Sequence, residues 1–136
     1  MRFPALSVTV AVVAATVAGG VAPAAADTPA STVNLVAGAG RHLNSATVTY
    51  EHVDGAVNSI KINSVEAYSG EPDCVWVEWN DPKYGWNALN SEPPCYGNSL
   101  LETPNRIIKA PKGYQLKVRL AAYHGSELVH KDIAKL

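Results

Sequence analysis

The chain has 136 residues, of which 17% are charged, with 11 Lys and Arg against 12 Asp and Glu and a formal net charge of −1. A net charge this close to zero does not favour electrostatic binding of nucleic acid or of an anionic membrane surface. The length suits one ordinary domain with a single modest core.

The first 26 residues have the features of a cleavable signal peptide. Arg2 supplies a positive start, an uncharged apolar stretch follows, and a run of small residues ends at Ala26. An uncleaved membrane anchor is the alternative, but Gly19, Gly20 and Pro23 interrupt the stretch before the roughly 20 apolar residues that a spanning helix needs. We therefore predict cleavage after Ala26 and a secreted, extracellular protein with no membrane attachment.

The remaining chain is predicted to form a flexible tether and one β-rich domain. Residues 27–32 contain mostly Ala, Pro, Ser and Thr, which is typical of a disordered segment. The domain is then expected to span 33–136.

Apolar and polar residues alternate along most of that domain. The predicted inward-facing residues are Val33 and Leu35, Val48 and Tyr50, Ile60 and Ile62, Val75, Val77 and Trp79, and Tyr114, Leu116, Val118, Leu120 and Ala122. Asp54-Gly55 and His124-Gly125-Ser126 are hairpin signals, and only residues 131–136 are ambiguous between helix and strand. We predict an all-β fold of about seven strands, either a single antiparallel sandwich or a small barrel.

Cys74 and Cys95 are the only cysteines. In the oxidising compartment that a signal peptide implies, we expect them to form a disulfide. It closes a loop of about 22 residues and is expected to contribute on the order of 3 kcal/mol. No other residue lies at zinc-ligand spacing from this pair, so neither a metal nor any other cofactor is expected.

One stretch of the sequence resembles the corner between strands E and F of fibronectin type III and related immunoglobulin-like domains. In those families a Pro-x-Gly turn leads to a tyrosine that opens an alternating strand, as Pro111-Lys112-Gly113-Tyr114 does here. Trp79, followed by Pro82, looks like the core tryptophan of an early strand. About 50 residues separate the predicted cleavage site from Trp79, more than one N-terminal strand needs. The resemblance implies a sandwich, and function does not follow from that fold.

The charges are unevenly distributed. Residues 51–92 hold eight acids and two bases, whereas residues 93–136 hold three acids and seven bases. Pairing or packing between strands of the two halves is the interpretation we favour over a dedicated charged binding face.

Catalytic signatures are not evident. The chain contains no Gly-x-Ser-x-Gly elbow, His-Glu-x-x-His or Cys-x-x-Cys, and its histidines, His42, His52, His124 and His130, are scattered. We therefore expect a protein that is not an enzyme.

Segment 80–96 is the most informative part of the chain for function. It carries Tyr84, Trp86 and Tyr96, and the expected disulfide would hold it. Loops concentrate binding residues, and aromatic rings give contact area at small entropic cost. The alternative is that Trp86 folds back to cap the core. Trp76 raises the same question, because it is predicted to face away from the core.

These features favour a secreted, monomeric binding protein. In the leading hypothesis it presents segment 80–96 as a stapled loop to an extracellular protein, for instance as a peptidase inhibitor. In the second hypothesis it is a carbohydrate-binding module of cell wall or biomass, with Trp76, Tyr84 and Trp86 stacking on sugar rings. A structural envelope protein is a third possibility.

Overall fold

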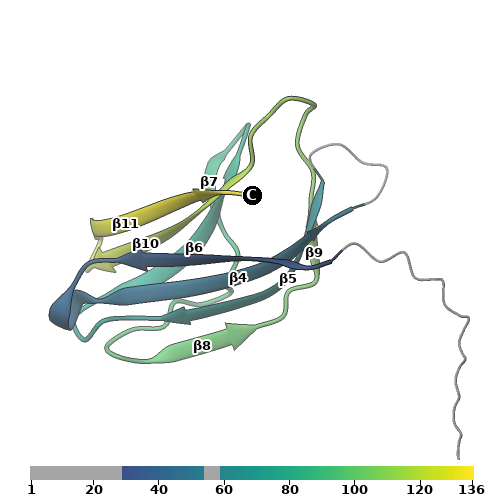
Figure 1. The fold of residues 1–136 in the computed structure, drawn as a ribbon. Coiled ribbons are helices and arrows are strands. Elements are labelled where there is room, and N and C mark those ends of the chain that lie inside the picture. Colours follow the sequence, from purple (N-terminus) through teal and green to yellow (C-terminus); the bar gives the residue numbers. More distant parts are fainter. Residues whose placement is uncertain (1–28, 54–58) are drawn as a thin grey trace, which may run out of the picture.

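The strands form two antiparallel sheets that pack face to face in the computed structural model, which describes residues 29–53 and 59–136 (Figure 1). The first sheet contains β3 (Ser31–Ala37), β4 (Asn44–His52), β5 (Ile60–Tyr68), β8 (Ser99–Glu102) and β9 (Arg106–Ile108). Its order is β3-β4-β5-β8, and β9 also pairs with β5. The second sheet has the order β11-β10-β6-β7. Its strands are β6 (Cys74–Asp81), β7 (Gly85–Ala88), β10 (Lys117–His124) and β11 (Glu127–Lys135).

The predicted all-β sandwich is therefore confirmed, and the two sheets do not close into a barrel over the described ranges. The predicted signal peptide, residues 1–26, and the Asp54-Gly55 turn lie outside the described residues. The two strands that flank this turn, β4 and β5, do pair as an antiparallel hairpin. The second expected hairpin joins β10 to β11, and Gly125 takes a φ of +65° in its turn.

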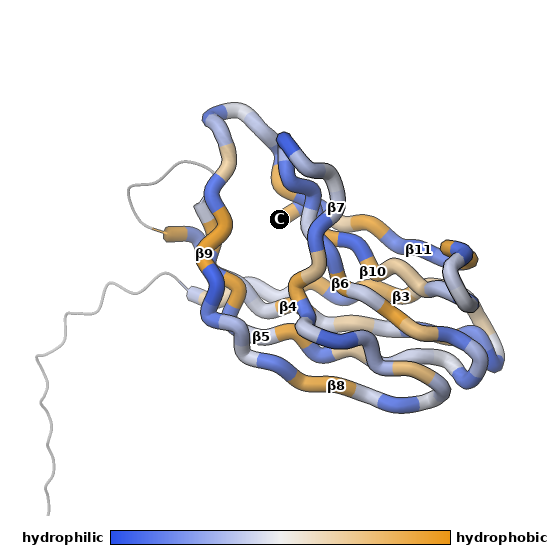
Figure 2. Tube along the Cα trace, turned by 180° about the vertical axis from the view of Figure 1, so that it is seen from behind, coloured by the Kyte–Doolittle hydropathy of each residue, from blue (hydrophilic) through white to orange (hydrophobic). Residues whose placement is uncertain are grey.

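The core lies between the sheets and includes most of the residues that the alternation pattern predicted to face inward, while Val33 and Tyr114 are half-buried against it. Core residues that the pattern did not identify are Ala37, Ala46, Val65, Ala67, Leu89 and Ile108. Along β6, Val75, Val77 and Trp79 are buried while their neighbours are half-buried. Other strands follow the same period of two, and Figure 2 shows hydrophobic and hydrophilic residues alternating along them. The other predicted residues that are buried are Leu35, Val48, Tyr50, Ile60, Ile62, Val118, Leu120 and Ala122 in strands and Leu116 directly before β10.

Nine strands occur in the described part of the chain, against about seven predicted. The additional strands are among β7, β8 and β9, which have four, four and three residues and are too short to show an alternating pattern. Residues 131–135, ambiguous from sequence, belong to β11. The first strand starts at Ser31, inside the predicted tether, because Ser31 and Thr32 pair with Tyr50 and Thr49 of β4.

The strand expected to open at Tyr114 begins instead at Lys117. The Tyr114 hydroxyl donates a hydrogen bond to the carbonyl of Asn80, at 3.0 Å and 34 residues earlier in the chain. In a tyrosine corner the hydroxyl bonds to backbone only a few residues upstream. The contact therefore holds the connection before β10 against the end of β6.

The predicted disulfide between Cys74 and Cys95 is present. It joins the start of β6 to the segment that returns from β7, and the two cysteines also form an isolated antiparallel bridge. Backbone bonds lie on both sides of it, from Val75 N–H to the Pro94 carbonyl at 3.0 Å and from Tyr96 N–H to the Asp73 carbonyl at 2.9 Å. The return segment is thus fixed along the edge of β6.

Candidate binding groove

The outer face of the second sheet carries Trp76 and Trp86, two of the four aromatic residues that the sequence singled out. Since side chains alternate along a strand, the burial of Val75, Val77 and Trp79 turns Trp76 and Glu78 outward. Asn80 pairs with Trp86 of β7, so Trp86 lies on this outer face as well. The same face of β10 carries Lys117, Arg119, Ala121 and Tyr123.

Ala121 lies near the centre of this face. It points outward but is 0% exposed, because longer side chains surround it. Its cross-strand neighbours are Trp76 on β6 and Lys131 on β11.

A groove of about 470 Å³ lies over β6 on this face, within the size range of small-molecule and glycan sites. The lower part is formed by Trp76, Glu78 and the disulfide-bonded Cys74. On one side the groove is bounded by the end of β10 and its hairpin, and on the other by β7 and the return segment. The bounding residues are Tyr123, Gly125, Ser126, Ala88 and Pro93.

The wall after β7 is held in place by Asn90, which is only 3% exposed. Its side-chain oxygen accepts the N–H of Val77 at 2.9 Å, and its amide nitrogen donates to the Glu92 carbonyl at 2.8 Å. The carboxamide thus substitutes for a peptide group at the edge of β6. Together with the disulfide, it fixes both ends of the short segment that forms this wall.

Trp86 is covered on one side by a charged pair. The guanidinium carbon of Arg119 lies 4.5 Å from the centre of the Trp86 ring, and its Nε is 2.7 Å from a carboxylate oxygen of Glu78. Both charged side chains are only 12% exposed. Arg119 therefore neutralises Glu78 and occupies one face of Trp86, and the aromatic residues that line the groove are Trp76 and Tyr123.

The structure separates the four predicted binding residues into three places. Trp76 and Trp86 share the outer face and are both half-buried, so Trp86 does not cap the core. Tyr84 is 71% exposed in the β6–β7 turn, whereas Tyr96 is 72% exposed beside the disulfide at the opposite end of β6. Contrary to the expectation of one presented loop, segment 80–96 contains the end of β6, a turn, β7 and the return segment.

Sequence reasoning did not single out Tyr123, Ala88 or Pro93 for the groove. The alternation in β10 places Lys117 and Arg119 outward, and extending it by four residues would also have turned Tyr123 outward. Pro93 and Ala88 could not be found this way, because their position depends on the path of the chain after β7.

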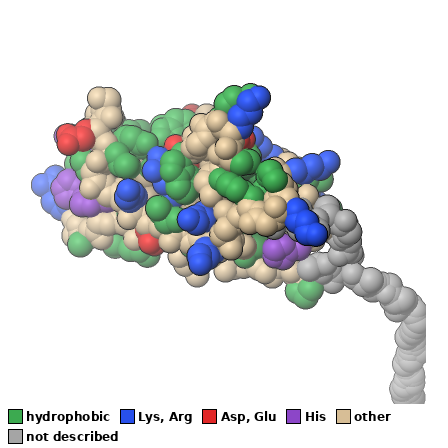
Figure 3. Space-filling model, turned by 90° about the horizontal axis from the view of Figure 1, so that it is seen from above, with side chains coloured by type: hydrophobic (Ala, Val, Ile, Leu, Met, Phe, Trp, Pro, Cys, Tyr) green, Lys and Arg blue, Asp and Glu red, His purple; other side chains and the backbone are tan. Residues whose placement is uncertain are grey.

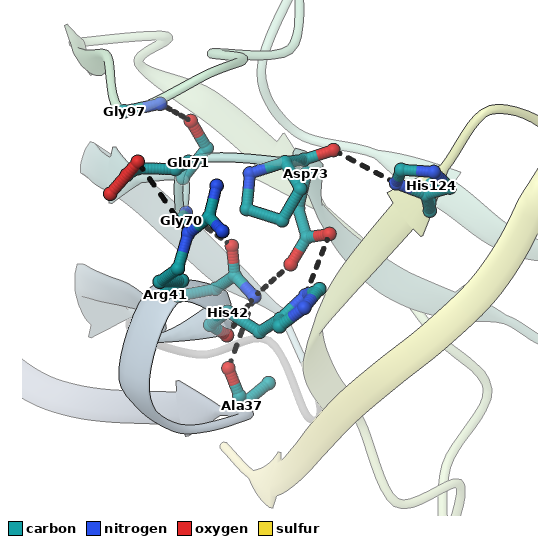
Figure 4. Close-up of polar contacts among 11 residues, drawn as sticks. Ala37, Arg41, His42, Gly70, Glu71, Asp73, Gly97 and His124 are labelled. Atoms are coloured by element: carbon teal, nitrogen blue, oxygen red, sulfur yellow. Dashed lines mark hydrogen bonds and ion pairs between the residues drawn. The ribbon is translucent and has the colours of Figure 1, made fainter.

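A second polar cluster lies at the end of the sandwich near the β10–β11 hairpin (Figure 4). Asn44 is 0% exposed; its amide nitrogen donates to the carbonyls of Ala37 and His42 and to the carboxylate of Asp73, at 2.8–3.1 Å. Its side-chain oxygen accepts the N–H of Gly70 at 2.6 Å. Both the nitrogen and the oxygen of this amide are hydrogen-bonded within the protein, which indicates a structural role in tying residues 37–44 to the β5–β6 connection.

The fold brings two of the four histidines together. The rings of His42 and His130 are 5.6 Å apart, and Nδ1 of His42 lies 3.4 Å from the buried carboxylate of Asp73. His124 bonds to the Pro72 carbonyl, while His52 lies beside Tyr50. Across residues 29–53 and 59–136 no three His, Cys, Asp or Glu side chains are placed to hold a metal ion.

Comparisons with protein-family models, with curated proteins and with solved structures found no match for this chain. Within the described residues, no helix has the length and apolar character to cross a membrane.

Proposed function

We propose that this protein is a non-catalytic glycan-binding module, with the sugar chain lying in the groove over Trp76. The observation that carries the proposal is the groove itself, which combines aromatic side chains with polar groups on a rigid sheet. Tryptophan and tyrosine offer flat apolar surfaces together with a polar atom, a combination that suits the mixed character of a sugar ring.

Free hydrogen-bonding groups support a sugar ligand. In the described part of the chain, neither the indole N–H of Trp76 nor the hydroxyl of Ser126 makes a hydrogen bond, and both residues line the groove. Binding sites typically combine an apolar lining with a few such polar groups, which fix the ligand's orientation. A glycan hydroxyl could accept from Trp76 and exchange a hydrogen bond with Ser126.

A second candidate function is docking of a protein at the β6–β7 turn. One carboxylate oxygen of Asp81 accepts the backbone N–H groups of Lys83 and Tyr84 at 2.7 and 3.0 Å, so the turn is ordered with Tyr84 exposed. An ordered aromatic tip is what an inhibitor or protein-binding loop requires. It offers a smaller contact than the groove, and we rank it second.

We also propose that the protein acts outside the cell and has an immunoglobulin-like topology. The disulfide supports an oxidising compartment. The order β7-β6-β10-β11 corresponds to C′-C-F-G of such domains, and β4, β5 and β9 correspond to A, B and E. In this assignment β3 is an additional N-terminal strand, which accounts for the long segment before Trp79.

Sedimentation with insoluble chitin, cellulose and peptidoglycan, together with a soluble glycan array, tests the glycan proposal. We expect at least one of these glycans to bind, and Trp76→Ala to weaken that binding about 30-fold or more, as for the loss of an interface hot spot. Tyr68→Ala is the matched control, since Tyr68 is 41% exposed on the other sheet. No binding to any glycan, or equal losses in both variants, would refute the proposal.

Tyr84→Ala separates the two candidate functions. If the turn docks a protein, this substitution abolishes binding of that partner while Trp76→Ala leaves it intact. If the groove binds glycan, the glycan affinity of Tyr84→Ala equals that of the unmodified protein.

A further inference from the structure

We propose that the ligand of the groove is an acidic polysaccharide, whose carboxylates are bound by a cluster of lysines on β10 and β11. This inference rests on the proposed glycan-binding function and adds the chemical class of the glycan. The lysine cluster consists of Lys117, Lys131 and Lys135.

The three lysines lie on the same face as the groove. In β11 the exposed residues alternate as Lys131, Ile133 and Lys135, and they pair with Ala121, Arg119 and Lys117 of β10. Lys131 is thus next to Ala121, whose other cross-strand partner is Trp76. An extended ligand leaving the groove across Ala121 would meet Lys131 first.

None of the three lysines has an acidic partner among the described residues. Two acidic groups of β6 and β11 are engaged elsewhere. Glu78 is paired with Arg119, and Asp132 points to the other side of β11, where it accepts the N–H of Val36 at 3.0 Å. Figure 3 views the molecule from the side that carries β10 and β11 and shows more basic than acidic side chains there.

Lys117 and Lys135 are direct cross-strand partners. Like charges in that position destabilise a sheet, so fold stability does not explain the pair. Lysines also protect free sheet edges from pairing with other chains. That role does not explain Lys117, because it lies on β10, which pairs with β11 on one side and β6 on the other. A ligand that supplies negative charge does explain the pair.

Carboxylates fit this surface better than phosphates. Arginine recognises phosphate through paired hydrogen bonds, but the one arginine of this face, Arg119, is occupied by Glu78. The remaining lysines act as separate point charges, and the chain as a whole has a net charge of −1, which disfavours a densely charged polyanion such as nucleic acid. A polysaccharide with at most one carboxylate per sugar matches sparse lysines next to aromatic rings.

The first experiment compares glycans that differ in charge. Polygalacturonate, alginate and hyaluronate are titrated into the full protein by calorimetry, with neutral pullulan, methyl-esterified polygalacturonate and duplex DNA as comparisons. We expect at least one uronate polymer to bind at least tenfold more tightly than the neutral and esterified polymers, with affinity falling as salt is raised.

The second experiment uses a substitution that should separate folding from binding. Lys135→Glu replaces the like-charge pair by an attractive one, so the melting temperature of the free protein should rise by roughly 1–6 °C. The same substitution should weaken uronate binding by fivefold or more. Lys61→Glu is the control, because it makes the same charge change on the outer face of the first sheet, where Lys61 pairs with Glu51; its uronate affinity should change less than twofold.

The outcomes distinguish this inference from the function on which it rests. If esterified and free polygalacturonate bind equally and Trp76→Ala abolishes both, the groove binds glycan but the acidic preference is wrong. If DNA binds as tightly as the uronates, or if Lys135→Glu and Lys61→Glu weaken binding equally, the lysine cluster is not a uronate site. If no uronate binds, the inference is overturned whatever the neutral glycans do.

Discussion

Two tryptophans on opposite sides of the same sheet should differ sharply in what they contribute to stability. Trp79 points inward and is 6% exposed, whereas Trp86 is half-buried on the outer face under Arg119. We predict that Trp79→Ala is severely destabilising and that Trp86→Ala is tolerated.

The expected magnitudes follow from these surroundings. Removing a buried tryptophan side chain costs about 3–5 kcal/mol, which is a large part of the 5–15 kcal/mol that stabilises a typical domain. Trp86→Ala removes a cation–π contact and a partly buried side chain. Together these losses should lower the free energy of unfolding by about 1–2 kcal/mol. At about 4 °C per kcal/mol for a domain of this size, the melting temperature should fall by about 12–20 °C for Trp79→Ala and about 4–8 °C for Trp86→Ala.

Thermal and urea denaturation followed by circular dichroism measures both values. Trp79→Phe is a useful control, because the indole N–H of Trp79 is buried without a hydrogen-bond partner and phenylalanine removes it while keeping an aromatic ring. It should be less destabilising than Trp79→Ala. Equal large losses for Trp79→Ala and Trp86→Ala would refute the assignment of Trp86 to the outer face.

Three further predictions concern the elements that hold the groove and the end of the sandwich. Reducing the Cys74–Cys95 bond should lower the melting temperature by about ten degrees or more, because the closed loop is worth on the order of 3 kcal/mol; an unchanged melting temperature would contradict this. Asn44→Ala should cost about 3 kcal/mol or more in urea denaturation, since it leaves several buried partners unsatisfied. Gly38→Ala should be similarly destabilising, because Gly38 has a φ of +88° and an added Cβ would lie 2.1 Å from the His42 carbonyl oxygen. If the free energy of unfolding falls by no more than about 0.5 kcal/mol, this turn readjusts freely and the reasoning is wrong.

Features set by local sequence could be predicted. The alternation along β6 and β10 identified the core side of each strand, including Trp79, because side-chain direction in a strand has a period of two. The two cysteines were paired correctly because no other cysteine was available.

Features set by strand register could not be predicted. Trp76 and Trp86 come to one face because β6 and β7 pair with Asn80 opposite Trp86, and the sequence signal for a four-residue strand is too weak to show that pairing. Asn90 and Asn44 carry no local signal for burial, yet both are buried and complete backbone hydrogen bonding of distant segments. Their partners depend on tertiary contacts that the local pattern does not contain.

Mapping the ligand on the protein by NMR tests the central claim most directly. A uronate oligosaccharide is titrated into isotope-labelled protein, and amide and indole shifts are followed in heteronuclear correlation spectra. We predict that the largest changes occur at the Trp76 indole and at the backbone of Ala88, Ala121 and Tyr123, all of which lie on the outer face of the second sheet. Changes concentrated at Tyr84, or on the outer face of the first sheet around Tyr68, would contradict the assignment of the groove as the binding site.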